Sequence, residues 1–215
     1  MFKRINSWCY ARYKKKISIS DESELINYAY YVAGTVGIMM AKILNTQNKY
    51  AYRYAVDLGI AMQLTNIMRD IIEDASMDRV YYPKVWIKLT SKNILENNSN
   101  TIKNINKASE KLFKLSEIYY KSAFKGIAFL PFRSRFAILL ALFVYRQIGR
   151  KIMKNSFSNL KKTEIISLYE KILCLFKVFF IFIFNFNTHV KKYQHDKNLH
   201  DNIDSKTFLK SIIYE

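Results

Sequence analysis

Residues 58–83, LGIAMQLTNIMRDIIEDASMDRVYYP, restrict the possible folds more than any other segment, because an apolar helical pattern carries a stripe of oxygen-bearing side chains. Asn66, Asp70 and Asp74 recur every four residues, so they share one face of an α-helix. Gln63 extends this stripe back by one turn. A carboxylate on a mostly buried helix is strongly destabilising unless a cation faces it. The segment therefore predicts a buried helix with a cation-binding stripe.

Magnesium fits this ligand set best, and Mn²⁺ is a possible substitute. Mg²⁺ prefers oxygen ligands and is commonly held by one or two carboxylates together with substrate phosphates. The stripe thus predicts a metal–diphosphate site with Asn66, Asp70 and Asp74 as ligands, while Arg69 and Arg79 meet the remaining phosphate oxygens. The alternative is that the two carboxylates form ordinary ion pairs with nearby basic side chains on a solvated face.

The composition favours one all-α domain that binds anions. The 215 residues suffice for one core, 50% of them are hydrophobic, and five Gly and two Pro leave long stretches of helical periodicity. The net charge of +18 attracts polyanions. Because Lys and Arg are scattered rather than gathered in a recognition helix, a membrane surface or a diphosphate is favoured and nucleic acid is not expected as a partner.

The cysteines and histidines predict no site of their own. Cys9 and Cys174 are far apart and lack a nearby partner, which indicates neither a disulfide framework nor a zinc motif and suits a reducing compartment. His189, His195 and His200 have no regular helical spacing and fall in a polar segment. We therefore expect the histidines at the surface without a role.

Apolar periodicity predicts the helices and the limits of the domain. The expected helices cover residues 22–44, 50–75, 101–125, 132–153 and 163–186, with a short helix and a loop between 84 and 100. The last long helix contains VFFIFIFNF, which is too short and too interrupted by Lys177 for a membrane span, so it is either core or an interfacial helix that meets anionic lipid. These helices form a domain over residues 1–187, and a charged, loosely ordered tail follows over 188–215.

Two long motifs resemble those of one enzyme family. The segment LGIAMQLTNIMRDIIEDASMDRVYYPKVW resembles the second aspartate-rich motif of the squalene/phytoene synthase family, with its QLxNxxRDxxED core and the RxYxP that follows. YAYYVAGTVGIMM, residues 28–40, resembles the other signature of that family, in its bacterial phytoene-synthase-like branch. ALFVYRQIGRKIM extends the resemblance more weakly, so that it covers roughly residues 21–173.

The resemblance implies the C-terminal portion of the all-α isoprenoid (terpenoid) synthase bundle and a head-to-head condensation of two prenyl diphosphates. The substrates would be farnesyl or geranylgeranyl diphosphate, and the products squalene- or phytoene-like in isoprenoid or carotenoid biosynthesis. Asp70 and Asp74 would hold Mg²⁺, Asn66 and Gln63 would complete or orient the ligands, and Arg69 would clamp phosphate. NADPH would be required only if the product is squalene.

The resemblance also places an apolar pocket along the first helix. Ala33, Gly34, Thr35 and Gly37 form a run of small residues, so something must approach this backbone closely. The occupant is either a neighbouring helix or a prenyl chain lying in the groove, which Val32 and Val36 would then flank.

Two tyrosines match family positions near the reaction. Tyr28 matches a tyrosine near the diphosphate and the cationic intermediate, and its alternative role is that of a core aromatic. Tyr145 matches a tyrosine near the active site.

One departure from the family pattern sets the expectation for activity. Family members carry an earlier aspartate-rich motif, but the 27 residues before Tyr28 contain no DxxxD. We expect weak or no turnover by this chain alone, which would then be a gene fragment, a split protein that needs a companion chain for the motif, or a relative that has lost catalysis. The alternative is a non-catalytic relative that acts as an assembly factor of the respiratory complex I type.

The N-terminal segment bears on location. The first 20 residues are basic but lack the apolar core of a secretory signal. We expect a cytoplasmic protein, peripheral on the inner membrane face, or an organellar one in a eukaryote.

Overall fold

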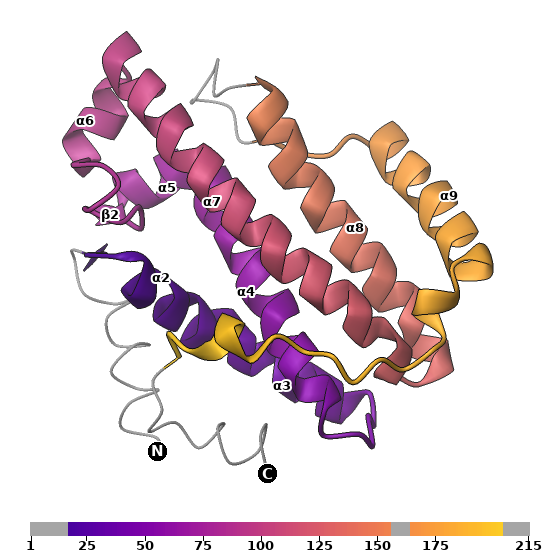
Figure 1. The fold of residues 1–215 in the computed structure, drawn as a ribbon. Coiled ribbons are helices and arrows are strands. Elements are labelled where there is room, and N and C mark those ends of the chain that lie inside the picture. The colour runs from indigo at the N-terminus through magenta and orange to yellow at the C-terminus, as the bar shows by residue number, and fades with distance from the viewer. Residues whose placement is uncertain (1–16, 156–163, 204–215) are drawn as a thin grey trace.

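The helices pack along one another around α4, Ala51–Arg69, which lies between α3, Thr35–Ile43, and the long α7, Ser99–Gly126 (Figure 1). The computed structural model describes residues 17–155 and 164–203. Cys9 and residues 204–215 of the predicted tail lie outside this part of the chain.

The α4 helix is central because apolar or small residues occupy several of its sides, so burial on these sides stabilises it. Ile60, Ala61 and Leu64 are fully buried. The Thr65 hydroxyl shares a hydrogen bond of 2.9 Å with the hydroxyl of Tyr120 on α7.

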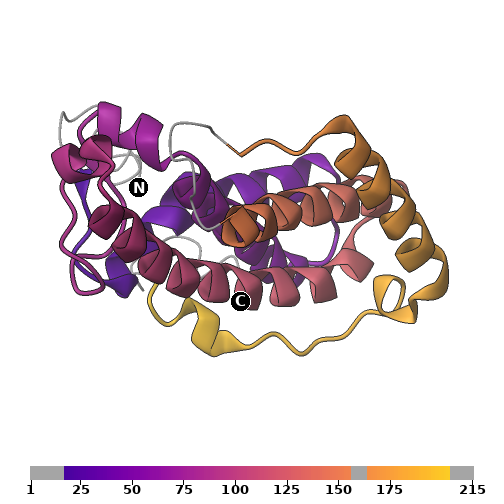
Figure 2. The same cartoon turned by 90° about the horizontal axis from the view of Figure 1, so that it is seen from above.

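The remaining elements agree in kind with the helices expected from periodicity. Before α3 come α2, Glu22–Ala29, and a π-helical turn, Tyr30–Gly34, so the helix expected over 22–44 is continuous with one wide turn at its small residues. After α7, a short 3₁₀ turn Ile127–Phe129 leads into α8, Phe132–Asn155, and then α9, Leu168–Phe184, which packs on the outer side of α8 (Figures 1 and 2).

The helix expected over 50–75 is broken in two, and in this respect the prediction was wrong. Asp70 has φ −99° and ψ 17°, which ends α4 and starts the short α5, Ile71–Ser76. The hydrogen-bond ladder survives the break, since Asp70 N donates to Asn66 O and Asp74 N donates to Asp70 O, both at 2.8 Å. The polar stripe is therefore bent at Asp70 but not dispersed.

A short parallel pairing and a small helix complete the end of the bundle beyond α5. The strand β2, Arg79–Val80, pairs with β1, Ile17–Ser18, and a loop leads from there to α6, Ser91–Glu96. In the described part of the chain, no helix combines the length and the hydropathy needed to cross a membrane.

Residues 185–203, here called the C-terminal strap, run back from α9 along α7 (Figures 1 and 2). The strap includes two short 3₁₀ turns, Phe186–Thr188 and Lys197–His200. The expectation of surface histidines was wrong for His195 and His200, which are buried, because the strap turns both rings toward α4. Cys174 on α9 is a buried free thiol.

Candidate active site

A cavity of about 330 Å³ lies among α3, α4, α7 and α8, and its walls are mainly apolar. Four of the predicted site residues line it: Val32, Val36, Asn66 and Tyr145. Three stretches of chain that are distant in sequence therefore contribute to one pocket. An elongated apolar chain with a polar end group suits such walls, because apolar side chains gain from removing its hydrocarbon from water.

Asn66 supplies the polar end of this cavity. Its Oδ1 is buried and has no hydrogen-bond partner among the described residues. Its Nδ2 lies 3.5 Å from Gln63 Oε1, so the predicted ligand-orienting residue is beside it. A buried carbonyl oxygen without a partner is costly, and a cation or a ligand donor would remove that cost. The oxygen donor set thus fits a hard divalent ion.

Arg69 and Asp70 form a two-pronged ion pair next to Asn66. Arg69 Nε lies 2.7 Å from Asp70 Oδ1, and Nη2 lies 2.8 Å from Oδ2. The hydrogen bond to Asp70 raises the pKa of the Arg69 guanidinium, and Tyr145 adds to the rise. The structure thus shows the ion-paired alternative for Asp70, and Tyr145 connects this pair to the cavity wall. The assignment of Asp70 to metal and of Arg69 to phosphate remains a prediction.

Asp74 and Arg79 lie beyond the break in the helix. Asp74 is partly buried on α5, and Arg79 is partly buried in β2. Burial raises the pKa of Tyr82 well above its usual range, and the negative charge of Asp74 raises it further. Neither Asp74 nor Arg79 is among the residues that line the cavity.

Tyr28 is also placed apart from the cavity lining. The side chain is buried, and its ring stacks on Tyr81 with centroids 4.8 Å apart and an interplanar angle of 27°. This contact joins α2 to the segment after β2, as expected of a core aromatic. Its catalytic assignment remains a prediction.

Several cavity residues were missed by sequence reasoning, although a signal for them exists. Leu58 and Met62 precede Asn66 at intervals of four residues on α4, and Ile138 and Ala141 precede Tyr145 on α8 by seven and four. Each series is one helix face leading to a polar residue. The residues that precede Asn66 and Tyr145 on the same helix faces could therefore have been predicted to form the apolar wall.

The helical fold thus encloses a mainly apolar cavity with the amide of Asn66 at its polar end. A sequence model of the squalene/phytoene synthase family matches residues 11–168, and the chain belongs to this family. One relative, the 15-cis-phytoene synthase of Enterobacter agglomerans, is 38% identical over 155 residues, which are 71% of this chain and 52% of the relative.

Two solved structures share the fold. A dehydrosqualene synthase in complex with ligand has a TM-score of 0.61 and 28% identity, covering 75% of this chain and 57% of that one. The squalene synthase HpnC from Alicyclobacillus acidocaldarius has a TM-score of 0.62 at 17% identity, covering 73% of this chain and 59% of that one, and shows the fold alone. The predicted family and the isoprenoid (terpenoid) synthase fold are confirmed. The chain spans about half the length of the curated relatives it matches.

Proposed function

We propose that this chain carries the prenyl pocket and part of the diphosphate site of a head-to-head prenyltransferase, acting on farnesyl or geranylgeranyl diphosphate. The observation that carries the proposal is the apolar cavity in which Asn66 Oδ1 lies buried without a partner. The apolar wall would contact the prenyl chain, and Asn66 Oδ1 would contact the cation that binds the diphosphate. The product would be of the phytoene or squalene type, and NADPH would act only if it is squalene.

The residues present fit a magnesium ion, or manganese in its place. Asn66, Asp70 and Asp74 would hold it, and when bound it would stabilise the negative charge that develops on the departing diphosphate. Asp70 would have to loosen its pairing with Arg69, which would leave that guanidinium available to a phosphate oxygen. Arg79 is the second candidate for such a contact.

The chain's own side chains would protect the carbocation that ionisation leaves. Val32, Val36 and the apolar faces of α4 and α8 line the cavity, and with a prenyl chain bound they would keep water away from the carbocation. Tyr145 lines the same cavity, and an aromatic ring there could stabilise positive charge. Tyr28 would act near the diphosphate only if its stacking on Tyr81 changes.

We further propose that full activity needs a second carboxylate motif in addition to the residues of this sequence. The family resemblance leads us to expect an earlier DxxxD motif facing this site, and none precedes Tyr28 in this sequence. Half of a carboxylate cage would hold diphosphate weakly. Turnover by this polypeptide alone should therefore be slow.

A membrane surface is the proposed location. Phe176, Phe179, Phe180, Ile183 and Phe184 lie on one face of α9 and are each at least 50% exposed. A second cavity of about 470 Å³ lies beside α9, and its mixed lining includes five basic side chains, those of Lys121, Lys125, Arg146, Lys177 and Lys192. Aromatic side chains next to lysines favour an interface with anionic lipid. An apolar product would leave directly into the bilayer, and the protein would be peripheral on the inner face or in an organelle.

The competing proposal is a non-catalytic assembly or binding factor. The Arg69–Asp70 pair favours it, because it satisfies Asp70 without any metal. Such a protein would not need the cavity or its buried Asn66 oxygen.

Binding and turnover measurements on the purified chain separate the two proposals. Calorimetric titration with geranylgeranyl and farnesyl diphosphate should show binding that requires Mg²⁺, and product analysis should show slow turnover that rises with a companion chain carrying DxxxD. Absence of binding with and without Mg²⁺ would exclude the enzyme proposal. Fast turnover by the chain alone would exclude the companion.

A further inference from the structure

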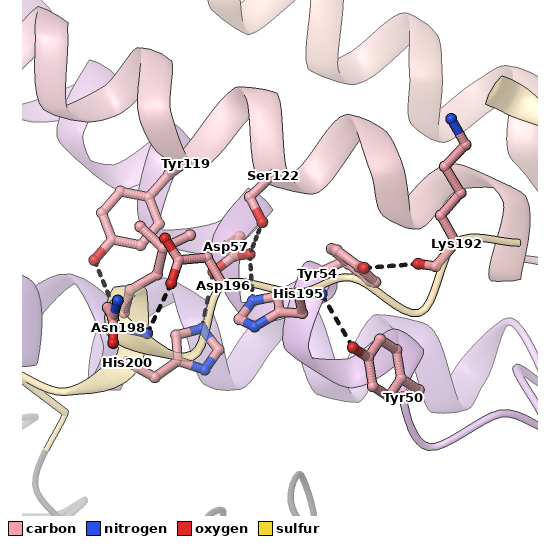
Figure 3. Close-up of polar contacts among 11 residues, drawn as sticks. Tyr50, Tyr54, Asp57, Tyr119, Ser122, Lys192, His195, Asp196, Asn198 and His200 are labelled. Carbon is pink, nitrogen blue, oxygen red and sulfur yellow. Dashed lines mark hydrogen bonds and ion pairs between the residues drawn. The ribbon is translucent and has the colours of Figure 1, made fainter.

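Asp57 is a charged residue at the centre of the bundle, and its side chain is 0% exposed. Its two oxygens meet imidazoles from the C-terminal strap: His195 Nε2 lies 2.9 Å from Oδ2, and His200 Nε2 lies 2.8 Å from Oδ1 (Figure 3). From α7, the Ser122 hydroxyl donates a hydrogen bond of 2.6 Å to Oδ2. One carboxylate thus joins α4, α7 and the strap.

The charge of this cluster is not balanced by a basic side chain. Burial alone would raise the pKa of Asp57, but hydrogen bonds from His195 and His200 outweigh it and lower the pKa below its usual range. Among the ion pairs of the described residues, Asp57 pairs only with these two imidazoles. A fully buried carboxylate needs a positive partner, so the cluster requires an extra proton or a bound cation.

We propose that Asp57, His195 and His200 bind a divalent transition metal, with zinc the ion favoured by the ligand types. One ligand atom from each residue lies within 4.8 Å of the others, and all three residues are buried. Two imidazoles and one carboxylate are a common zinc ligand set, and the fourth position of the tetrahedron would go to Ser122 Oγ or water. Imidazole nitrogen suits zinc and copper, whereas magnesium prefers oxygen.

Binding of a metal ion requires particular protonation states of the two imidazoles. An imidazole that binds metal through Nε2 must carry its proton on Nδ1. His195 Nδ1 is buried without a hydrogen-bond partner among the described residues, so no existing contact opposes the change of tautomer. Zinc–ligand bonds of about 2.1 Å would require the present N···O separations to widen by roughly half an ångström.

This site is separate from the predicted magnesium stripe. Asp57 precedes Asn66 by nine residues, which places the two on opposite sides of α4 and about 13 Å apart along its axis. The strap is held beside it by further contacts, from the Tyr54 hydroxyl to Lys192 O at 3.0 Å and from the Tyr119 hydroxyl to Leu199 O at 2.8 Å (Figure 3). Since Tyr54 also lines the cavity, zinc would fasten the strap to one cavity wall.

Metal analysis of the untagged full chain tests the proposal. After treatment with EDTA, incubation with zinc and gel filtration, the wild type should retain about one zinc per chain. His195→Asn and His200→Asn should each weaken zinc binding by about tenfold or more, because each removes a ligand. His189→Asn is the matched control, since its ring meets Phe182 O outside the cluster, and it should bind zinc as the wild type does.

Two readouts on the wild type keep the test decisive if the variants do not fold. Zinc should raise the melting temperature, and Co²⁺ in its place should give the intense visible absorption of a tetrahedral site. A folded wild type that retains no zinc, or whose zinc is displaced by millimolar Mg²⁺, would overturn the proposal. Retention of zinc by folded His195→Asn/His200→Asn would do so as well.

Discussion

Gly59 of α4 lies against the backbone of Ala33 so closely that a Cβ on Gly59 would be 2.2 Å from the Ala33 carbonyl oxygen. The contact is reciprocal along the crossing, because a Cβ on Gly37 would be 2.1 Å from the carbonyl oxygen of Ala55. The run of small residues therefore serves the neighbouring helix, which was one of its two expected roles. It also serves the cavity, since Ala33 and Gly37 belong to its lining.

Gly59→Ala should destabilise the protein strongly. The new methyl group would overlap backbone, which cannot rotate away, so the free energy of unfolding should fall by roughly 3 kcal/mol or more. Gly149→Ala is the matched control, because its Cβ would meet Phe113 at 3.4 Å, an ordinary contact in a helix. That variant should be neutral or gain about 0.5–1 kcal/mol. Urea unfolding followed by circular dichroism measures the free energy of unfolding of both variants. Equal losses of this free energy in the two variants would contradict the close helix crossing at Gly59.

Asn66→Ala should abolish Mg²⁺-dependent binding of prenyl diphosphate without unfolding the chain. The substitution removes the buried Oδ1 that lines the cavity and leaves the apolar walls intact. The control is Asn104→Ala on the exposed face of α7. Calorimetric titration with and without Mg²⁺ is the measurement. Unchanged Mg²⁺-dependent affinity in Asn66→Ala would show that this oxygen is not a ligand.

Asp70→Asn separates a metal ligand from a simple partner of Arg69. The side chains of the pair are only 26% and 23% exposed, so its loss should lower the free energy of unfolding by about 1–3 kcal/mol. If Asp70 also binds metal, the Mg²⁺-dependent affinity for diphosphate should fall at least about tenfold. Glu96→Gln, which breaks the exposed Lys92–Glu96 pair, is the control. A variant that keeps the full affinity would leave Asp70 with the structural role alone.

Glu170 should contribute a pH-dependent part of the stability. A hydrogen bond from Lys151 is the main cause that lowers the pKa of Glu170 from 4.5 to about 2, and the Ser167 backbone N–H adds to it. Because the folded-state pKa is depressed, this stabilisation is complete above the ordinary value and is lost as the pH falls toward the folded-state value. The difference in unfolding free energy between wild type and Glu170→Gln should therefore shrink between pH 5 and about pH 2.

Urea titrations across that range measure this difference. Glu110→Gln, at an exposed carboxylate of α7, serves as the comparison. A difference for Glu170→Gln that stays constant over the whole range would contradict the hydrogen bonds to Glu170 from Lys151 and from the Ser167 backbone N–H.

The exposed face of α9 should carry membrane binding. Phe180→Ser/Phe184→Ser removes two large side chains that are 57% and 73% exposed, so folding should be little affected. Partition onto phosphatidylglycerol vesicles should fall about tenfold or more, because each buried Phe contributes roughly 1.5–3 kcal/mol. Val85→Ser, at a side chain 71% exposed in the loop before α6, is the control. Equal sedimentation of all three with vesicles would place the membrane contact elsewhere.

The amino-acid sequence determined the helical class, the family and most of one helix face. The regular spacing of the residues before Asn66 places them on one face of a helix. Such a relationship involves only a few turns of chain, so periodicity alone can predict it. Periodicity did not predict the break at Asp70, because the helical pattern of the sequence is uninterrupted there. The pairing of Asp70 with Arg69 was only one of the two roles expected for this carboxylate.

Only the tertiary structure decided the cavity and the Asp57 cluster. Asp57 and His195 are 138 residues apart, and no local pattern records which side of α4 a returning segment will cover. The same holds for Tyr145, which joins the wall of Val32 and Asn66 only through the packing of α8 beside α4. The sequence predicts the apolar and polar faces of each helix because these faces depend on local geometry. Which faces pack together depends on the path of the whole chain and on the surface that it buries.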